Sequence, residues 1–282
     1  MKNLKQTSIA RLPKSVLVPE LFFKYVYEPH RPVIIENYLE PDVLHHRWSP
    51  THLVKRFGDR RVEVKIFEGI QGTHGLRFQS LCLGSTTMLF RDFVEQSLQS
   101  FQGGLTYYLR LAESSRDIPE IFEEIHFPQC FNQQGTGISD WSTVDHFIRI
   151  GATSYEYPIH CDGYENFLVQ LSGHKHIVFF EPSELDRLYL DGEDLHRSTV
   201  NDIDHPDLDR FPKFADTTPI YCDLKPGDLL YIPVLWFHNV RSRGWSVSSN
   251  SYQTQPNKLA YIEQHKTNVW RQYEKENGVR VY

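Results

Sequence analysis

The stretch from Gly227 to His238 reads GDLLYIPVLWFH and is the most informative in the chain. Its first two residues follow Pro226 and predict a turn. The apolar run Leu229–Ile232 predicts a buried strand, which Pro233 ends. His238 then follows an aromatic pair. Histidine is the commonest metal ligand, although a single histidine is weak evidence for a site. The segment therefore predicts a strand of an antiparallel β fold and one candidate ligand.

A second candidate for metal binding is His160-Cys161-Asp162. Alternate residues of a strand project from the same face, so His160 and Asp162 could share one ion if this segment is extended. Two histidines and a carboxylate form the ligand set of iron(II) enzymes that activate oxygen, although the same set could hold zinc. With 14 histidines in 282 residues, about one H-x-D is expected by accident. His205-Pro206-Asp207, with proline at its centre, is interpreted as that accident.

The rest of the chain predicts the fold that surrounds this candidate site. Short apolar or alternating runs between turns, over 145–252, predict an antiparallel sandwich or barrel. Before about residue 130, helix and strand patterns are mixed, with strands expected at 32–35 and 62–66 and a helix at 48–57. Residues 186–209 hold eight acidic residues against two arginines and predict a surface insertion. Four apolar positions after residue 256 predict one amphipathic helix that stops at Gly278.

Composition bounds the class of protein. A chain of 282 residues that is 40% hydrophobic can bury a single large core. No apolar run reaches the length of a membrane span, and the start MKNLKQTS lacks the centre of a secretory signal, so an intracellular protein without membrane contact, cytoplasmic or nuclear, is expected. Four scattered cysteines suggest neither a disulfide framework nor a zinc cluster. A net charge of −6 argues against a wholly basic nucleic-acid-binding surface.

Together, these segments resemble the JmjC branch of the cupin superfamily, whose distal histidine ends a G-D-x-x-x-x-P-x-x-W-x-H pattern. Turn, strand, proline, tryptophan and histidine all fall at that spacing here. The resemblance implies a mostly β fold with flanking helices, a double-stranded β-helix or jelly roll. It implies one JmjC domain over 1–282, with a mixed N-terminal part (1–130), a β-helix core (131–255) carrying the insertion 186–209, and a C-terminal amphipathic helix (256–278).

The resemblance also implies a dioxygenase that uses iron(II), 2-oxoglutarate and dioxygen, with no catalytic residue beyond the metal ligands His160, Asp162 and His238. Residues at the positions that bind 2-oxoglutarate in this family are Tyr108, Asn166, Lys175 and Asn250. Lys175 would pair with the distal carboxylate, and Tyr108 would donate a hydrogen bond to it. Judged without the family, Lys175 could equally be a surface lysine, Tyr108 a core residue, and the asparagines turn residues.

Within the family, the likeness extends to hydroxylases of the wybutosine pathway, which modify a guanine of phenylalanine tRNA. It rests on residues 106–110, 162–175, 201–208 and 235–240. A tRNA substrate needs basic and aromatic groups near the site. Candidates are Lys55, Arg56, Arg60, Arg61, Lys65, Arg149, Arg241, Arg243 and Trp245.

Other functions stay open on the sequence. A protein or peptide side-chain hydroxylase or demethylase is the main alternative, because a basic peptide would suit the acidic segment 186–209. A zinc hydrolase and a non-catalytic cupin-like metal-binding module are further alternatives. The C-terminal helix, with Trp270, is a candidate for a homodimer contact.

Overall fold

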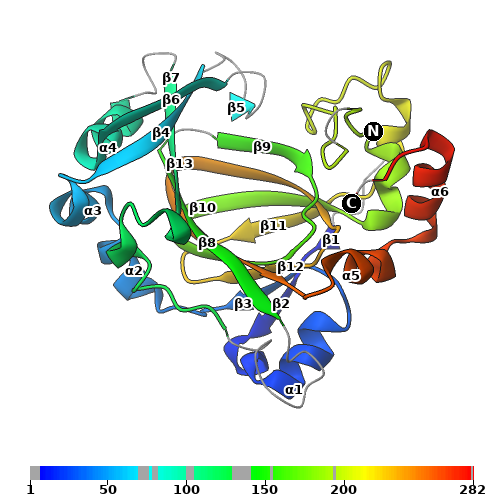
Figure 1. The fold of residues 1–282 in the computed structure, drawn as a ribbon, viewed down its shortest axis with the longest axis horizontal. Helices are drawn as coiled ribbons and strands as arrows, with labels where there is room; N and C mark the ends of the chain where they lie inside the picture. Colours follow the sequence, from blue (N-terminus) through cyan, green and yellow to red (C-terminus); the bar gives the residue numbers. More distant parts are fainter. Residues whose placement is uncertain are drawn as a thin grey trace.

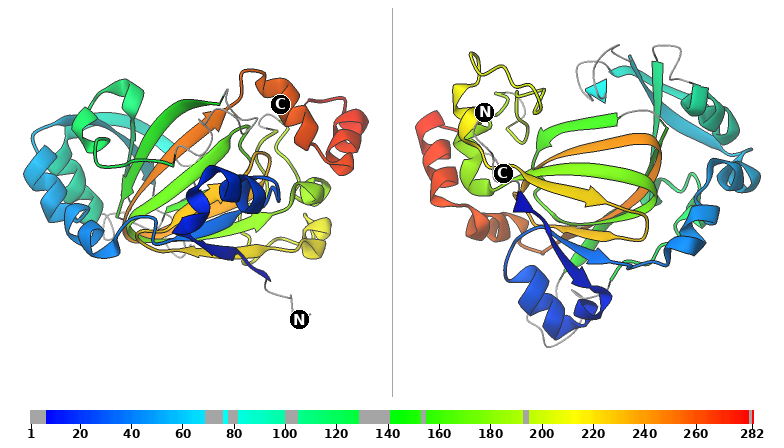
Figure 2. Two further views of the ribbon diagram at one scale, coloured as in Figure 1. Left: turned by 90° about the horizontal axis from the view of Figure 1, so that it is seen from below. Right: turned by 180° about the vertical axis from the view of Figure 1, so that it is seen from behind.

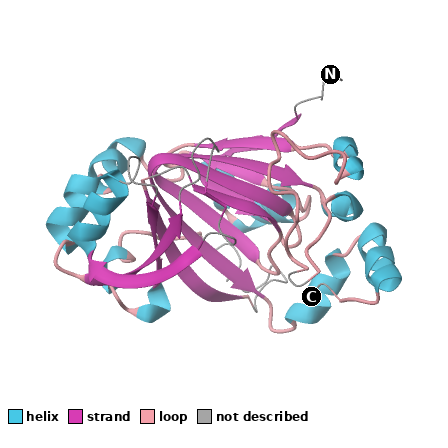
Figure 3. Cartoon of the chain, turned by 90° about the horizontal axis from the view of Figure 1, so that it is seen from above, coloured by secondary structure: helices cyan, strands magenta, loops and turns pink. Residues whose placement is uncertain are grey.

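The structure is a computed structural model and describes residues 7–68, 76–77, 82–99, 105–128, 141–152, 155–192, 195–280 and 282. Strands fill the middle of the molecule, and helices gather at both ends of them (Figures 1 and 3). The strands are β1 Thr7–Ser8, β2 Ala10–Pro13, β3 Val33–Glu36, β4 Arg61–Glu68, β5 Leu76–Arg77, β6 Cys82–Leu89, β7 Leu105–Ala112, β8 Ser142–Gly151, β9 Tyr155–His160, β10 Glu165–Phe180, β11 Ile220–Leu224, β12 Leu229–Ile232 and β13 Phe237–Thr254. The α-helices are α1 Pro19–Phe22, α2 Pro41–Arg47, α3 Pro50–Phe57, α4 Phe90–Gln99, α5 Lys258–His265 and α6 Asn268–Asn277. Short helical turns cover Lys14–Leu17, Phe23–Tyr27, Glu113–Ser115, Pro119–Ile121, Pro182–Arg187 and Pro212–Asp216.

Two long strands, β10 and β13, organise the sheet by pairing antiparallel over nearly their whole length. The first half of β10 also pairs with β12 and its second half with β11, while β13 pairs first with β9 and then with β8. The register between β10 and β13 shifts near Gly173, whose φ is +70° and where a Cβ would meet the carbonyl oxygen of Trp245 at 2.1 Å. The bulge bends both strands, so each contributes to two β layers, as a jelly roll requires.

The N-terminal part extends this sheet at both edges. The strand order is β2-β3-β12-β10-β13-β8-β7-β4-β6, and α4 packs on β4, β6 and β7. Both views of Figure 2 show helices on either side of the strands. The strands expected at 32–35 and 62–66 and the helix expected at 48–57 are confirmed as β3, β4 and α3. The mostly β fold with flanking helices is likewise confirmed. The boundary expected near residue 130 lies outside the described residues.

The expectations about membrane-spanning helices and about cysteines can be compared with the described residues. No helix among them is both long and apolar enough to cross a membrane. Cys82, Cys161 and Cys222 form no disulfide within the described residues, and Cys130 lies outside the described part of the chain.

The C-terminal segment forms two helices, so the expectation of one continuous helix over 256–278 is wrong. The chain turns at Lys266, and the side chain of Thr267 caps α6 by accepting a hydrogen bond from the backbone N–H of Trp270. Gly278 ends α6 in the left-handed conformation, as expected. Trp270 is fully buried and stacks on Phe237 at a centroid distance of 5.6 Å. A homodimer stays a prediction, but Trp270 packs within its own chain and is not available to a second copy.

We expect Trp270→Ala to lower the free energy of unfolding by about 3–5 kcal/mol, because it removes a fully buried aromatic ring and leaves a cavity beside Phe237. Urea denaturation followed by circular dichroism measures this change. Leu259→Ala on α5, at a side chain that is 57% exposed, is the matched control and should change stability by less than about 1 kcal/mol. Equal losses in the two variants would contradict the packing described.

Candidate metal and cosubstrate site

Three candidate ligands meet at the start of β13. His160 ends β9 and pairs directly with His238 in the β9–β13 register. Their ligand atoms and that of Asp162 all lie within 4.8 Å of one another, and the His238 Nε2 to Asp162 Oδ2 distance is 3.8 Å. Asp162 lies beyond the end of β9, so the expectation that both H-x-D residues sit on one strand holds for His160 alone. The backbone N–H of Leu235 donates to the Asp162 carbonyl at 3.0 Å and holds this segment near His238.

Backbone carbonyls orient both imidazole rings. The carbonyl oxygen of Pro158 lies 2.9 Å from His160 Nδ1, and that of Trp236 lies 2.9 Å from His238 Nδ1. A proton on each Nδ1 leaves Nε2 as the free electron-pair donor. Burial lowers the pKa of both histidines, that of His160 well below its ordinary value, so both rings are neutral at pH 7. Neutral imidazole is the form that binds a metal.

Asp162 supplies the third donor. Its Oδ2 is buried and has no hydrogen-bond partner among the described residues. A buried carboxylate oxygen without a partner is costly unless an ion or another group completes its environment. Two neutral imidazole nitrogens and one such oxygen suit a divalent transition metal with open positions for other ligands. The residues therefore fit a metal.

A cavity of about 510 Å³ opens beside these ligands. Asp162 is the single acidic side chain among the described residues that line it. The basic residues that line it are Lys65, Arg110, Arg149, Lys175 and Arg197. Such a positive cavity favours anionic ligands over cationic ones.

Lys175 on β10 lies inside this cavity and is 5% exposed. Its ammonium group makes no hydrogen bond or ion pair with the part of the chain that the structure describes. Burial, with Arg149 nearby, lowers its pKa to about 7. An unpaired buried cation is unfavourable by itself, so the position is suited to an anion that enters from outside.

The other residues expected to bind 2-oxoglutarate lie around the same cavity and are linked through Arg149. Asn250 donates to the Asn166 side-chain oxygen at 3.0 Å and accepts from Arg149 Nε at 2.9 Å. Arg149 also donates to the Tyr108 hydroxyl at 3.4 Å. Sequence reasoning placed Arg149 with the tRNA candidates. The strand alternation of β8 could have shown that Arg149 lies on the face opposite the apolar Ile148 and Ile150. The register, which only the structure shows, then pairs it with Ser248, two residues from Asn250.

Two of the candidate tRNA-binding residues beyond His238 have side chains that are held by contacts within the protein. Arg241 is buried and pairs with Glu156 at 3.2 Å and with Asp204. The indole N–H of Trp245 donates to the carbonyl of Trp48, and the ring packs against the core. Arg241 is therefore not available for RNA, Trp245 is partly buried against the core, and the side chain of Arg243 is outside the described structure. Ion pairs with Glu124 and Glu120 also occupy Arg56 and Arg60 on the surface.

The acidic segment 186–209 is more than a surface insertion. Its backbone joins β9 next to the ligands, because the N–H of Cys161 donates to the His196 carbonyl and that of Ser198 to the Ile159 carbonyl, both at 2.9 Å. Arg197 between them lines the cavity. The second H-x-D copy lies elsewhere in this segment, and the His205 side chain is 79% exposed. His205 and Asp207 are not part of the His160–Asp162–His238 group.

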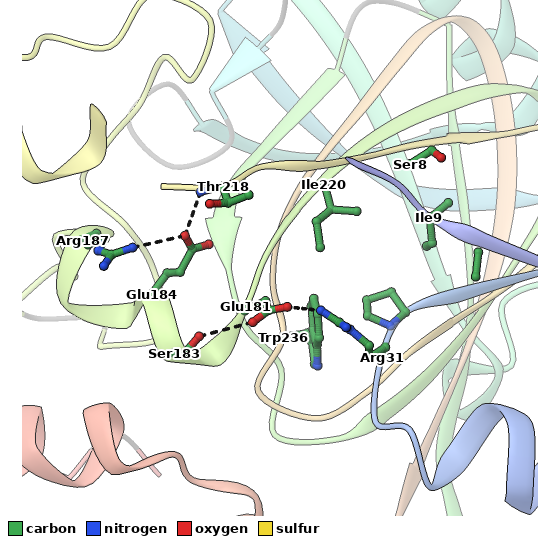
Figure 4. Close-up of a pocket in the computed structure, with 12 residues that line it drawn as sticks. Ser8, Ile9, Arg31, Glu181, Ser183, Glu184, Arg187, Thr218, Ile220 and Trp236 are labelled. Atoms are coloured by element: carbon green, nitrogen blue, oxygen red, sulfur yellow. Dashed lines mark hydrogen bonds and ion pairs between the residues drawn. The ribbon is translucent and has the colours of Figure 1, made fainter. Parts of the chain in front are cut away.

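A second cavity of about 590 Å³ is lined in part by Trp236, Arg31 and Glu181 (Figure 4). Its charged side chains form ion pairs with one another, and Arg187 lies 3.6 Å from Glu184. Arg31 pairs with Glu181, and Glu184 accepts from the Thr218 backbone N–H at 2.7 Å. The metal-ligand group found in the described residues lies in the first cavity and not here. The first cavity is therefore the better candidate for an active site.

Comparison with known proteins agrees with this geometry. The family model described as "Cupin-like domain" matches residues 19–258. The chain is similar to tRNA wybutosine-synthesizing protein 5 of Danio rerio, at 30% identity over 83% of this chain and 72% of that protein. The human protein of the same name is 27% identical over 83% of this chain and 74% of its own length. Lysine-specific demethylase 8 of Xenopus tropicalis is 28% identical over 81% of this chain and 49% of its own length. The chain belongs to the cupin-like family, in its JmjC branch.

Proposed function

We propose that the protein is an iron(II)- and 2-oxoglutarate-dependent hydroxylase. The observation that carries this proposal is the unpaired, buried ammonium group of Lys175 in the same cavity as His160, Asp162 and His238. A zinc hydrolase needs the three ligands and an activated water, but its chemistry does not require a buried cation in the same cavity. A dicarboxylate cosubstrate that reaches both the metal and Lys175 uses both features.

In this proposal, each described residue has a definite task. His160, Asp162 and His238 hold iron(II), which together with 2-oxoglutarate supplies oxygen activation, with release of succinate and carbon dioxide. Lys175 pairs with the distal carboxylate, and the Tyr108 hydroxyl donates to it. Asn166, Asn250 and Arg149 form a connected set that keeps the polar wall of the cavity in place. The apolar side chains Leu168, Ile232 and Val240 exclude water from the same space.

For the substrate, we propose the modified guanine of phenylalanine tRNA in the wybutosine pathway. The names of several relatives support this, and the positive cavity suits a phosphate-bearing substrate. The second candidate is a protein side chain, supported by the demethylase relatives. A cationic lysine or arginine side chain would be repelled by the basic residues of the cavity, which favours tRNA.

The test begins with the iron-loaded protein and 2-oxoglutarate under anaerobic conditions. A weak visible charge-transfer band is expected, followed by succinate formation when oxygen is admitted, and added tRNA should stimulate succinate formation more than a basic peptide does. No band and no succinate from folded, iron-loaded protein would overturn the hydroxylase and leave a zinc enzyme or a binding module. Stimulation by the peptide alone would overturn the tRNA assignment and keep the hydroxylase.

We expect the affinity for 2-oxoglutarate to fall as the pH rises above about 7. In the free protein, the pKa of Lys175 is lowered to about 7, so the ammonium is charged below this pH and neutral above it. The dianion binds the charged form and raises this pKa, so the dissociation constant should rise by up to about tenfold per pH unit between the free and bound pKa values. Calorimetric titration from pH ~6 to ~9 measures it. Lys175→Arg, which stays charged, is the control and should show a flat profile over this range. The same flat profile in the unmodified protein would contradict the prediction.

A further inference from the structure

A row of three aromatic rings crosses one wall of the candidate active-site cavity. Phe147 on β8 meets Tyr252 on β13 at a centroid distance of 5.7 Å, and Tyr252 meets Tyr164, which precedes β10, at 5.9 Å. Both contacts are edge-to-face, with interplanar angles of 72° and 67°. All three rings line the cavity and are partly exposed. We call Phe147, Tyr252 and Tyr164 the aromatic row.

A cation lies over each end of the aromatic row. The guanidinium of Arg110 is 4.0 Å from the centroid of Phe147, and the ammonium of Lys258 is 3.6 Å from that of Tyr164. In the middle, Arg149 donates to the Tyr252 hydroxyl at 3.4 Å. Neither Arg110 nor Lys258 makes an ion pair with a carboxylate in the described part of the chain. The rings therefore hold both positive charges in place while no acidic side chain neutralises them.

A series of aromatic rings flanked by unneutralised cations matches the chemistry of an unpaired nucleic-acid strand. Bases stack on aromatic side chains, and the phosphates between them are attracted to lysine and arginine. A paired helix keeps its bases inside the stack, so it could meet the cations but not the rings. A lysine- or arginine-rich peptide would be repelled from both ends of the row.

We propose that the aromatic row, with Arg110 and Lys258, is the surface that binds an unpaired RNA segment and directs one of its nucleotides into the cavity. This deepens the proposed function and rests on it. All three rings line the cavity, so a nucleotide that reaches the metal ligands would have its neighbours in the strand along the row. The cations at the two ends would then contact phosphates on either side of that nucleotide.

The test measures RNA binding without turnover, by fluorescence anisotropy in the absence of oxygen and 2-oxoglutarate. The probes are a labelled RNA hairpin with an unpaired loop and a fully paired RNA of the same composition. The protein should prefer the looped RNA. Lys258→Ala and Tyr164→Leu should each weaken its binding by about tenfold, and Lys258→Ala should also reduce the slope of log affinity against log salt by about 1.

Matched controls separate recognition from a general loss of charge or of folding. Lys275→Ala removes an exposed lysine on α6, and Tyr25→Leu removes an aromatic ring that is 48% exposed; neither residue lines the cavity. Both should bind the looped RNA as the unmodified protein does. Tyr164→Phe keeps the ring and should also retain binding, which distinguishes stacking from a hydrogen bond of the hydroxyl. Thermal denaturation establishes that each variant is folded.

Equal affinity for looped and paired RNA, or unchanged affinity in folded Lys258→Ala and Tyr164→Leu, would overturn the inference. So would tighter binding of an acidic peptide than of the looped RNA. The inference and the proposed function fail separately. Oxygen-dependent succinate formation without RNA binding would remove only the aromatic row as an RNA surface, whereas RNA binding without succinate would remove only the hydroxylase.

Discussion

Replacing His160 with alanine should abolish oxygen-dependent succinate formation and weaken the binding of manganese(II), as a stand-in for iron(II), by about 100-fold or more. Loss of an outer partner of a metal ligand already costs about 10–100-fold in affinity, and His160 is itself a candidate ligand. Its ring is held by the Pro158 carbonyl with Nε2 free, and it lies next to His238 at a centroid distance of 4.2 Å. Titration calorimetry with manganese(II) measures affinity independently of turnover.

The chain offers its own control for this experiment. His205 belongs to a second H-x-D sequence but has a largely exposed side chain away from the three converging ligands. His205→Ala should therefore leave both metal affinity and succinate formation unchanged. The assignment of the metal site is wrong if His205→Ala has the larger effect, or if His160→Ala still binds manganese(II) normally.

The second large effect is expected for Lys175→Met, which should raise the dissociation constant of 2-oxoglutarate by at least about 100-fold. Removing one partner of a buried ion pair costs about 3–5 kcal/mol, because the other charge is left without compensation. Metal affinity should be unchanged, since Lys175 is not among the converging ligands. Calorimetric titration of the metal-loaded variant with 2-oxoglutarate measures the loss.

The same substitution should make the free protein more stable at neutral and lower pH. The pKa of Lys175 is lowered in the folded state, so the unfolded chain binds more protons and stability rises with pH above about 7. Methionine removes this penalty and keeps most of the side-chain volume. Thermal denaturation without 2-oxoglutarate should show a higher midpoint for Lys175→Met than for the unmodified protein. Lys225→Met, at an exposed turn residue close to β11, is the matched control and should change neither property. A destabilised Lys175→Met would show that Lys175 has a structural partner instead.

Much of the candidate site could be predicted because its residues follow local rules. The turn at Gly227, the strand β12 and the histidine after the aromatic pair all depend on neighbours in the chain. The mostly β fold follows from strand alternation and turn spacing in the same way. The one long-range element in that prediction, the grouping of His160, Asp162 and His238, came from the family resemblance, and the structure places these side chains together.

The sequence by itself determined the fold class and the candidate ligands, since short patterns specify turns, strands and residue types, whereas the role of Lys175 was indicated by the family resemblance. Tertiary structure alone decided which side chains share the cavity. It turned Arg149 inward beside Asn250, buried Arg241 against Glu156, and split the C-terminal segment into two helices. The physical reason is that contacts between distant strands depend on register and on bulges such as the one near Gly173. No local pattern specifies those pairings, because each is set by the packing of segments far apart in the chain.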